Sequence, residues 1–322
     1  MIASTSRPAT WKFLLAFGAI YFLWGSTYLA IRIGVSEVPP FLLAGMRFTS
    51  AGLILYGWMR LQGVESPSLR EWRYATLLGT IVFVLDYGAL FWAERRVPSG
   101  IAAVVLATIP VFISILDITF LRTQRLTLRL GAALLVGLAG VAVLMNNSMT
   151  LGEAPVDRAG ALALLLAAVS WSFATILTRK LPLPASKGMN SAAQMLTGGV
   201  LLIAIAFGAG ELKGFRFAAV SAKTWLALVY LVIAGSIAAF TAYIWLLHYE
   251  SPTKVGTYAY VNPVVAVAIG YWFGGENVGA RTLMGTALIL VSVITINMGS
   301  TLAKQRGDSG VPQFESEVEE AG

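Results

Sequence analysis

Trp24-Gly-Ser-Thr-Tyr-Leu-Ala-Ile-Arg32 returns 147 residues later as Trp171-Ser-Phe-Ala-Thr-Ile-Leu-Thr-Arg179. Both copies lie within apolar runs and place a Trp eight residues before an Arg. Further landmarks recur in the same order at offsets of 149 to 153: Met46 with Met195, Trp72 with Trp225, Trp92 with Trp245, and Pro110 with Pro263. An offset that drifts slowly and stays in register with the apolar runs indicates an internal duplication.

The composition indicates that the chain is surrounded by lipid. Of its 322 residues, 57% are hydrophobic and only 12% are charged, and the mean hydropathy is +0.75. A soluble domain carries roughly 25% charged residues, so this chain could not cover a surface exposed to water. We therefore expect an integral membrane protein.

Ten apolar runs, each about as long as a helix needs to cross a bilayer, are separated by short connections. The runs are continuous rather than alternating, which favours helices over a β-barrel. They fall at about 11–32, 41–60, 72–93, 99–121, 128–146, 159–179, 189–209, 224–247, 254–273 and 281–301. The first run is longer than the apolar part of a signal peptide and lacks a clear cleavage site, so we interpret it as a span. The sequence thus predicts an all-α membrane protein with ten transmembrane helices.

The ten spans divide into two related repeats of five, residues 1–150 and 151–306, followed by an acidic tail at 307–322 that we expect to be disordered. Because five is odd, the second repeat has to enter the membrane in the opposite orientation. A 5+5 inverted repeat is the architecture of many secondary transporters, whose substrate site lies near the midplane between the halves. Duplication of a stable bundle without a transport role is the alternative interpretation.

Charge predicts the orientation of the chain. An even number of spans puts both termini on one side, and fourteen Lys and Arg fall on that side against nine on the other. The positive-inside rule therefore favours cytoplasmic termini. The basic residues that give the net charge of +7 lie at the ends of apolar runs, where they orient the chain in the membrane. We therefore expect no nucleic-acid partner.

Two tryptophans mark the predicted substrate site. Trp24 and Trp171 lie ~12–18 Å from the charged ends of their spans, where an indole N–H must face protein or a cavity. Thr27 and Tyr28 beside Trp24, and Thr175 beside Trp171, add hydroxyls at similar depth. Trp72, Trp92, Trp225 and Trp245 are instead spaced to sit at the two membrane interfaces as belt residues.

The ninth span adds a polar face near a proline. Tyr258 and Asn262 are four residues apart and share one helix face, and an Asn in mid-span needs a polar partner. Pro110 and Pro263 each remove a backbone donor and are predicted as hinges. A fixed structural kink is the alternative for both prolines.

Arg47 and Asp86 are charges predicted to lie at the same depth inside the membrane, ~9 Å from the outer boundary. Two interpretations remain: an Asp86–Arg47 ion pair that joins the second and third spans, or a proton-coupling role for Asp86.

The residue inventory excludes several kinds of site. The chain has no Cys and a single His, His248, so thiol chemistry, His-based metal centres and the usual metalloprotease motif are absent, and we expect no cofactor, no metal and no catalytic residue. A channel would show a polar-lined filter, and we identify none. The expected partners are a small-molecule substrate and the lipid bilayer, with the oligomeric state left open.

Several motifs resemble the EamA family of the drug/metabolite transporter superfamily. They are Trp24–Tyr28 with Arg32, Met46–Phe48, Ala259–Val264, and Gly275–Glu276, and the resemblance covers about residues 1 to 301. The first half departs from this pattern, because Thr123 stands where the second half has Glu276. We therefore interpret Glu276 as a loop or helix-cap residue.

The resemblance implies a bacterial inner-membrane secondary carrier that exports amino acids or related metabolites. The aromatic candidates favour aromatic and other hydrophobic amino acids. Exporters of drugs or nucleobase-type metabolites are the alternative, and an intramembrane enzyme or a channel would be a different class.

Overall fold

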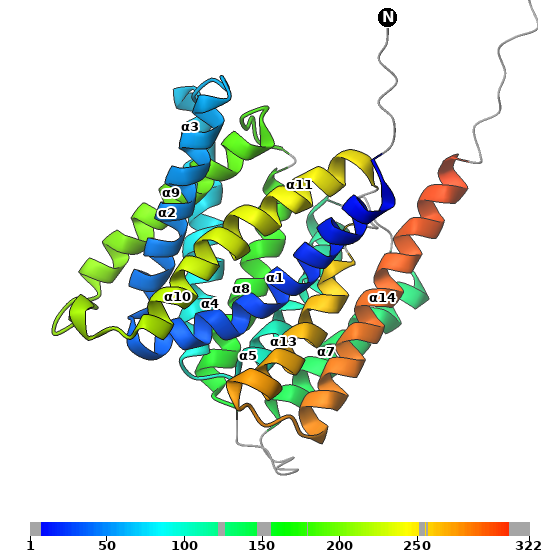
Figure 1. Cartoon of the computed structure of the whole chain (residues 1–322). Helices are drawn as coiled ribbons and strands as arrows, with labels where there is room; N and C mark the ends of the chain where they lie inside the picture. Colours follow the sequence, from blue (N-terminus) through cyan, green and yellow to red (C-terminus); the bar gives the residue numbers. More distant parts are fainter. Residues whose placement is uncertain are drawn as a thin grey trace, which may run out of the picture.

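The computed structural model describes residues 8–121, 126–146, 156–178, 180–250, 255 and 257–308, and these residues form helices and their connections, with no strand among them (Figure 1). The helices are α1 (Thr10–Glu37), α2 (Pro40–Leu61), α3 (Leu69–Gly79), η1 (Thr80–Tyr87), α4 (Gly88–Glu94), α5 (Ser99–Leu106), α6 (Ile109–Leu116), η2 (Asp117–Leu121), α7 (Leu128–Met145), α8 (Arg158–Thr178), α9 (Lys187–Gly208), η3 (Phe217–Ala219), α10 (Ala222–Tyr230), η4 (Leu231–Ala238), α11 (Ala239–Tyr249), α13 (Tyr258–Gly274) and α14 (Ala280–Asp308).

Each of the ten predicted apolar runs coincides with one helix or with consecutive helices. Within the described residues, seven are by length and composition apolar enough to cross a membrane, and they include α1, α7, α8 and α9. The helices α2, α13 and α14 are outside this set, although α14 carries a shorter apolar stretch at Ala280–Ile296. The multi-helix membrane architecture is therefore established, whereas the division into ten spans stays a prediction. Of the predicted acidic tail, residues 309–322 lie outside the described residues.

Caps and prolines define where the helices begin. The Ser68 hydroxyl accepts from the N–H of Glu71, whose carboxylate accepts from the N–H of Ser68, so α3 begins with a capping box. Pro98 directly precedes α5, and Pro40 is the first residue of α2, where the missing proline N–H leaves no helical bond unmade.

Two spans contain matching irregularities. The third predicted span passes through the π-helical segment η1, and the eighth passes through η4. Both segments are eight residues long and they begin 151 residues apart. Because π-helical segments are rare, their recurrence at the same offset as the sequence landmarks supports the internal duplication.

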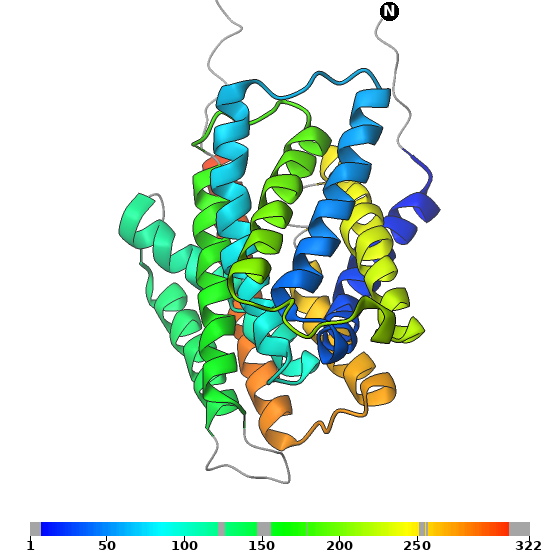
Figure 2. The ribbon, with the colours of Figure 1, turned by 90° about the vertical axis from the view of Figure 1, so that its left-hand side faces the viewer.

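The two faces of the bundle are defined by its ends. In Figures 1 and 2, α1 begins and α14 ends at one face, which we term the terminal face. The connections 95–98 and 275–279 lie at the opposite, distal face. The helix α1 begins at the terminal face and α8 begins at the distal face, so these two sequence-related helices run in opposite directions (Figure 2).

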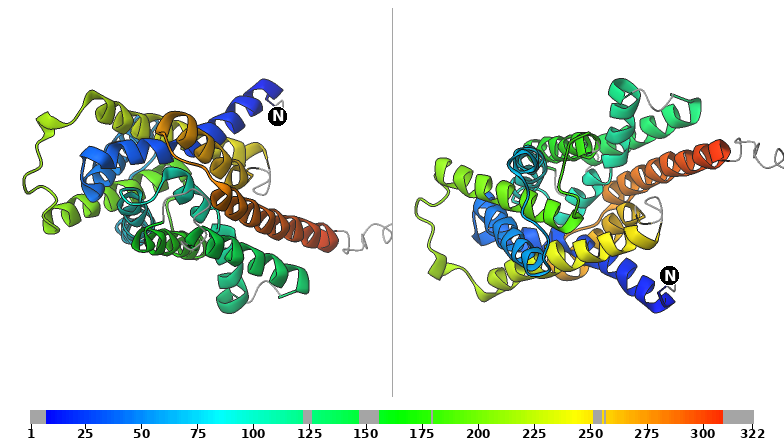
Figure 3. Two further views of the ribbon diagram at one scale, coloured as in Figure 1. Left: turned by 90° about the horizontal axis from the view of Figure 1, so that it is seen from below. Right: turned by 90° about the horizontal axis from the view of Figure 1, so that it is seen from above.

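The halves pack through helix pairs that each contain one member from either half. The pair α2 and α9 and the pair α7 and α14 form the most extensive contacts, and Figure 3 shows α9 and α14 at opposite ends of the molecule. A Cβ on Gly140 would lie 3.0 Å from the carbonyl oxygen of Gly285, and a Cβ on Gly285 would lie 3.1 Å from that of Gly140. The glycines of the fifth and tenth predicted spans therefore pack helices within the chain.

We expect Gly140→Ala to destabilise the protein by about 1–3 kcal/mol, because the added methyl group would lie 2.8 Å from Cγ1 of Ile289 and also 3.0 and 3.1 Å from backbone atoms of Gly285 and Ile289 in α14. Gly57→Ala on α2 is the matched control, since a Cβ there has no atom within 4 Å. The measurement is the melting temperature of each detergent-solubilised variant. Equal melting temperatures for the two variants would contradict the close packing of α7 on α14.

Candidate functional site

A cavity of about 530 Å³ lies inside the helix bundle. This volume is within the range of small-molecule sites. Its walls come from α1, η1, α4, α5, α6, η2, α8, α11, α13 and α14, and thus from both halves of the chain. The lining residues are Trp24, Thr27, Tyr28, Ile31, Asp86, Tyr87, Leu90, Ala103, Leu106, Ala107, Ile109, Pro110, Ile113, Ser114, Asp117, Trp171, Thr175, Tyr243, Tyr258, Ala259, Asn262, Pro263 and Ile296.

The structure brings the candidates from the sequence together around this one cavity, with a single exception. The residues that line it are Trp24, Thr27, Tyr28, Trp171, Thr175, Tyr258, Asn262, Pro110, Pro263 and Asp86. Arg47 does not line it. None of the four tryptophans assigned to the membrane interfaces lines it either.

In the cavity wall, aromatic rings from one half of the chain pack against aromatic rings from the other half. The ring of Trp24 lies 5.4 Å from that of Tyr243 and 4.9 Å from that of Tyr258, both in the second half. The ring of Trp171 lies 6.2 Å from that of Tyr87, in the first half. Each repeat thus contributes a Trp that packs edge-on or tilted against tyrosines of the other repeat, which is a favourable ring geometry.

The two tryptophans differ in the hydrogen bonding of their indole N–H groups. The Nε1 of Trp24 donates to the carbonyl of Gly235 in η4 at 3.0 Å, so protein satisfies this donor. For Trp171 no hydrogen bond is found within the described part of the chain, which leaves its N–H for a ligand. The repeat therefore supplies two rings but only one available indole donor.

The threonines and the asparagine bond mainly to backbone. Thr27 donates to the carbonyl of Trp24 at 2.6 Å, and Thr175 donates to that of Trp171 at 2.9 Å, so both hydroxyls retain only acceptor capacity toward a ligand. With its amide oriented to satisfy both neighbours, Asn262 donates to the carbonyl of Tyr258 at 3.2 Å and to that of Tyr21 at 3.1 Å. Asn262 thereby ties α13 to α1, and the expected polar partner is backbone.

The predicted ion pair between Asp86 and Arg47 is not formed. The Nε of Arg47 donates to the hydroxyl of Ser236 at 3.0 Å, and its guanidinium lies over the ring of Tyr87, 5.4 Å from the centroid. Asp86 is 3% exposed, and its Oδ1 has no partner within the described residues. Equal depth in the membrane did not imply contact, because Asp86 faces the cavity whereas Arg47 lies behind Tyr87.

The two prolines occupy different backbone environments. The fourth predicted span is interrupted between α5 and α6, at residues 107 and 108, and Pro110 stands in the first turn of α6. In contrast, α13 continues through Pro263. Only Pro110 therefore coincides with a break in its span.

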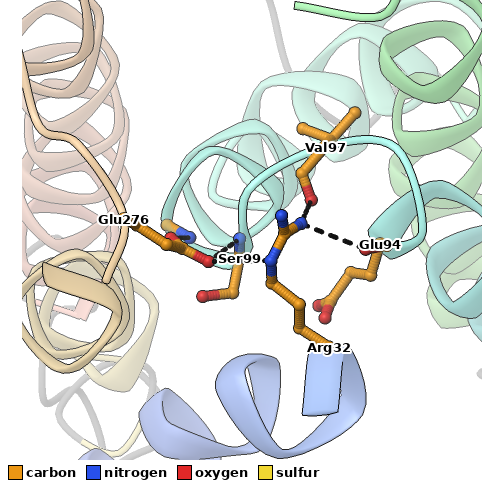
Figure 4. Close-up of polar contacts among 6 residues, drawn as sticks. Arg32, Glu94, Val97, Ser99 and Glu276 are labelled. Carbon is orange, nitrogen blue, oxygen red and sulfur yellow. Dashed lines mark hydrogen bonds and ion pairs between the residues drawn. The ribbon is translucent and has the colours of Figure 1, made fainter. Parts of the chain in front are cut away.

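A polar cluster lies at the distal face (Figure 4). Glu276 accepts from the N–H of Ser99 at 2.7 Å and from that of Gly100 at 3.1 Å, so its carboxylate caps the start of α5. The Nε of Arg32 lies 3.4 Å from the Glu276 carboxylate. The other end of the Arg32 guanidinium donates to the carbonyls of Val97 at 2.6 Å and Glu94 at 3.2 Å.

This cluster, which we term the distal lock (Arg32, Glu94, Val97, Ser99, Gly100 and Glu276), joins α1 to the connections 95–98 and 275–279. Its members adjoin the lining of the cavity, since Ile31 directly precedes Arg32. The expectation that Glu276 is a cap is confirmed, although it caps α5 rather than its own helix.

Several lining residues are not among the candidates from the sequence. Tyr87, Tyr243 and Asp117 all line the cavity. Ser114 lies one turn before Asp117 and was not considered. The available signal was helical spacing, because Pro110, Ser114 and Asp117 share one face.

The lining of the cavity is suited to binding a small molecule. Within the described residues no cluster of three or more His, Cys, Asp and Glu side chains could hold a metal ion. What the cavity does contain is a wide aromatic surface with a few hydroxyls, one indole donor and carboxylates. Such a surface can enclose a small, partly apolar molecule.

Known proteins resemble this chain over most of its length. The model of the EamA-like transporter family matches residues 10–146 and again residues 158–298. The chain is 37% identical over 287 residues to the uncharacterized inner membrane transporter YedA of Escherichia coli (strain K12), covering 88% of this chain and 90% of that protein. It is 25% identical over 286 residues to protein PecM of Dickeya dadantii, covering 88% and 92%. A solved crystal structure superposes with a TM-score of 0.61 at 25% identity, over 89% of this chain and 98% of that one.

Opening of the distal lock can be followed by labelling, because the chain has no native cysteine. In an Ile31→Cys background, we expect Glu276→Gln to raise the rate of reaction with a membrane-impermeant maleimide, applied at the distal face, several-fold. The reason is that the amide loses the ion pair with Arg32 and holds the α5 N-terminus more weakly.

Glu211→Gln is the matched control for this experiment. Glu211 accepts from the N–H groups of Phe41 and Leu42 at the start of α2, in the same capping arrangement, but it does not line the cavity. Equal acceleration by both variants would show that loss of any cap loosens the bundle, and the lock would then have no specific role.

Proposed function

Because the chain belongs to the EamA-like transporter family, and is a membrane transporter of that type, we propose that it exports a small molecule by alternating access between its two halves. The observation that carries this proposal is a cavity lined by both halves. We propose that the distal lock, which includes Arg32 directly after the lining residue Ile31, closes its distal end. In a secondary transporter the binding site lies between repeats that rock around it. Movement of α1 relative to the 95–98 connection would open the distal end.

The substrate class that we propose is amino acids, aromatic or hydrophobic, or related small metabolites. The ring surface built by Trp24, Trp171 and Tyr258 supports an apolar or aromatic portion of the substrate. Tyr28, Thr27, Thr175 and Asn262 are proposed to bound the same site.

Other classes are less well supported. Export of drugs or nucleobase-type metabolites is the alternative within the same mechanism, and it would use the same aromatic surface. The relatives are described as transporters, which points away from an enzyme. A channel would carry flux without saturation or counter-flow, and this separates it from a carrier.

We propose the inner membrane as the location, with residues 1–150 and 151–306 as inverted five-span repeats and both termini cytoplasmic. The description of YedA as an inner membrane transporter supports the location. The opposite directions of α1 and α8 support the inversion. In this orientation the distal lock faces the periplasm, and Pro110, at the broken fourth span, serves as a hinge, with Pro263 as the second hinge candidate.

Counter-flow tests the proposed activity. Purified protein in proteoliposomes, without an ion gradient, should accumulate radiolabelled phenylalanine or another large apolar amino acid against an internal pool of the same compound. Trp171→Ala should lower the initial rate at least about tenfold, since it removes the ring and the available indole donor.

Trp225→Ala is the control for the counter-flow measurement, because Trp225 does not line the cavity. Its rate should stay near that of the unmodified protein. Absence of counter-flow for every amino acid in the panel would refute the amino-acid assignment, and equal loss in both Trp variants would refute the site.

Proton coupling at Asp86 is the role left open once the ion pair with Arg47 is absent. Of the charged groups around it, Asp117 also lines the cavity, Glu94 lies about two turns further along the same span, and Arg47 lies over the ring of the adjacent Tyr87. If protons entering through the protein drive export, an acidic exterior should accelerate substrate efflux. A carboxamide cannot carry that proton, so Asp86→Asn should reduce the ratio of efflux rates with and without the gradient to about one. A ratio unchanged by Asp86→Asn would exclude coupling at this residue.

A further inference from the structure

The charges on the cavity wall indicate the sign of charge that a ligand should carry. The described lining contains two carboxylates, Asp86 and Asp117, and no Lys, Arg or His. Asp86 is 3% exposed, lines the cavity, and its Oδ1 has no hydrogen-bond partner among the described residues. A buried carboxylate without a partner is unfavourable, and a ligand that supplies a cation would satisfy it.

An anionic ligand group finds no cationic side chain in the described lining. The Arg47 guanidinium lies 5.4 Å from the ring centroid of Tyr87, and its Nε donates to Ser236. Its Nη1 is buried without a partner among the described residues, but Arg47 is not part of the lining. The start of α6 could in principle bind an anion, but the N–H groups of Val111 and Phe112 both donate to the carbonyl of Thr108. A ligand carboxylate would therefore meet only hydroxyl groups and one indole N–H.

The rings around the cavity favour the same sign of charge. Trp24, Tyr28, Tyr87, Trp171, Tyr243 and Tyr258 all contribute to the lining. The face of an aromatic ring attracts a cation, and the attraction grows when the site is shielded from water. Tyr87 directly follows Asp86, so carboxylate and ring occur together on the same wall.

We infer that the cavity selects a small organic molecule with a protonated amine, held by the Asp86 carboxylate and by the surrounding rings. The inference rests on the proposed ligand site and narrows its substrate class: the ammonium group is recognised, and a carboxylate on the ligand is not required. Amines then bind more tightly than amino acids of the same skeleton, and carboxylic acids bind least.

A series of three ligands with one skeleton tests this order in the full-length purified protein. The ligands are 2-phenylethylamine, phenylalanine and 3-phenylpropionate, which carry a cation, both charges and an anion. We expect the dissociation constant of the amine, measured by equilibrium binding of radiolabelled ligand, to be at least about tenfold below that of the acid.

Variants assign the preference to Asp86. In Asp86→Asn the advantage of the amine over the acid should disappear, whereas Asp86→Glu, which retains the charge, should retain a preference for the amine. Ser292→Ala is the matched control, since it removes a buried hydroxyl that donates to a backbone carbonyl but does not line the cavity, and its preference should equal that of the unmodified protein.

The inference is overturned if 2-phenylethylamine binds no more tightly than 3-phenylpropionate, including the case in which neither binds. It is also overturned if Asp86→Asn, folded by its melting temperature, keeps the full preference. The proposed function fails separately: counter-flow of amino acids without a preference for amines keeps the carrier and removes the inference. A preference for amines in binding, with no flux of any substrate, would keep the inference and remove the carrier.

Discussion

Every polar group that this chain places between its helices must find a partner within the protein, because hydrocarbon offers none. The carboxylates of Glu276 and Glu211 each accept from two backbone N–H groups at a helix start. Trp24 donates to a carbonyl of a neighbouring helix, and Asn262 bridges two carbonyls. Several buried polar atoms nevertheless have no partner among the described residues, including Oδ1 of Asp86, both carboxylate oxygens of Glu94 and Nη1 of Arg47. Of these three residues only Asp86 lines the cavity, where a ligand can supply the missing partner.

The duplication explains why the site is built twice and yet is not symmetric. Each repeat supplies a mid-membrane Trp, and each Trp packs against a Tyr from the third span of the other repeat, Trp24 against Tyr243 and Trp171 against Tyr87. The symmetry does not extend to the hydrogen bonds, since the N–H of Trp24 donates to a carbonyl whereas that of Trp171 has no acceptor among the described residues. The wall formed by Trp171, Tyr87 and Asp86 therefore offers more free polar groups than the wall formed by Trp24.

Helix periodicity and depth were sufficient to predict most residues of the cavity from sequence. A fixed rise per residue sets how deep Trp24 and Trp171 lie, and the repeat added independent support for both. Depth does not determine the direction in which a side chain points, and the Asp86–Arg47 ion pair failed for this reason. Asp86 lies in the π-helical segment η1, where the number of residues per turn differs from that of an α-helix. A face predicted from the α-helical period is rotated there.

The distal lock lay beyond sequence reasoning for a different physical reason. Arg32 and Glu276 are 244 positions apart, and each is typical of the polar end of a span when considered by itself. Only the packing of α1 beside α13 brings them together. Gly25 permits that packing, since a Cβ there would lie 2.7 Å from the side chain of Val265.

The continuous helix α1 links ligand and lock mechanically. It carries Trp24, Tyr28 and Ile31 on the cavity wall and Arg32 in the lock, all within two and a half turns. Eight residues of α-helix span ~12 Å and move as one body, whereas the fourth span is broken between α5 and α6 and can bend. In the proposed alternating-access mechanism, a ligand that moves α1 through Trp24 would also shift the guanidinium of Arg32 relative to the start of α5. This helix would then couple occupation of the cavity to opening of its distal end.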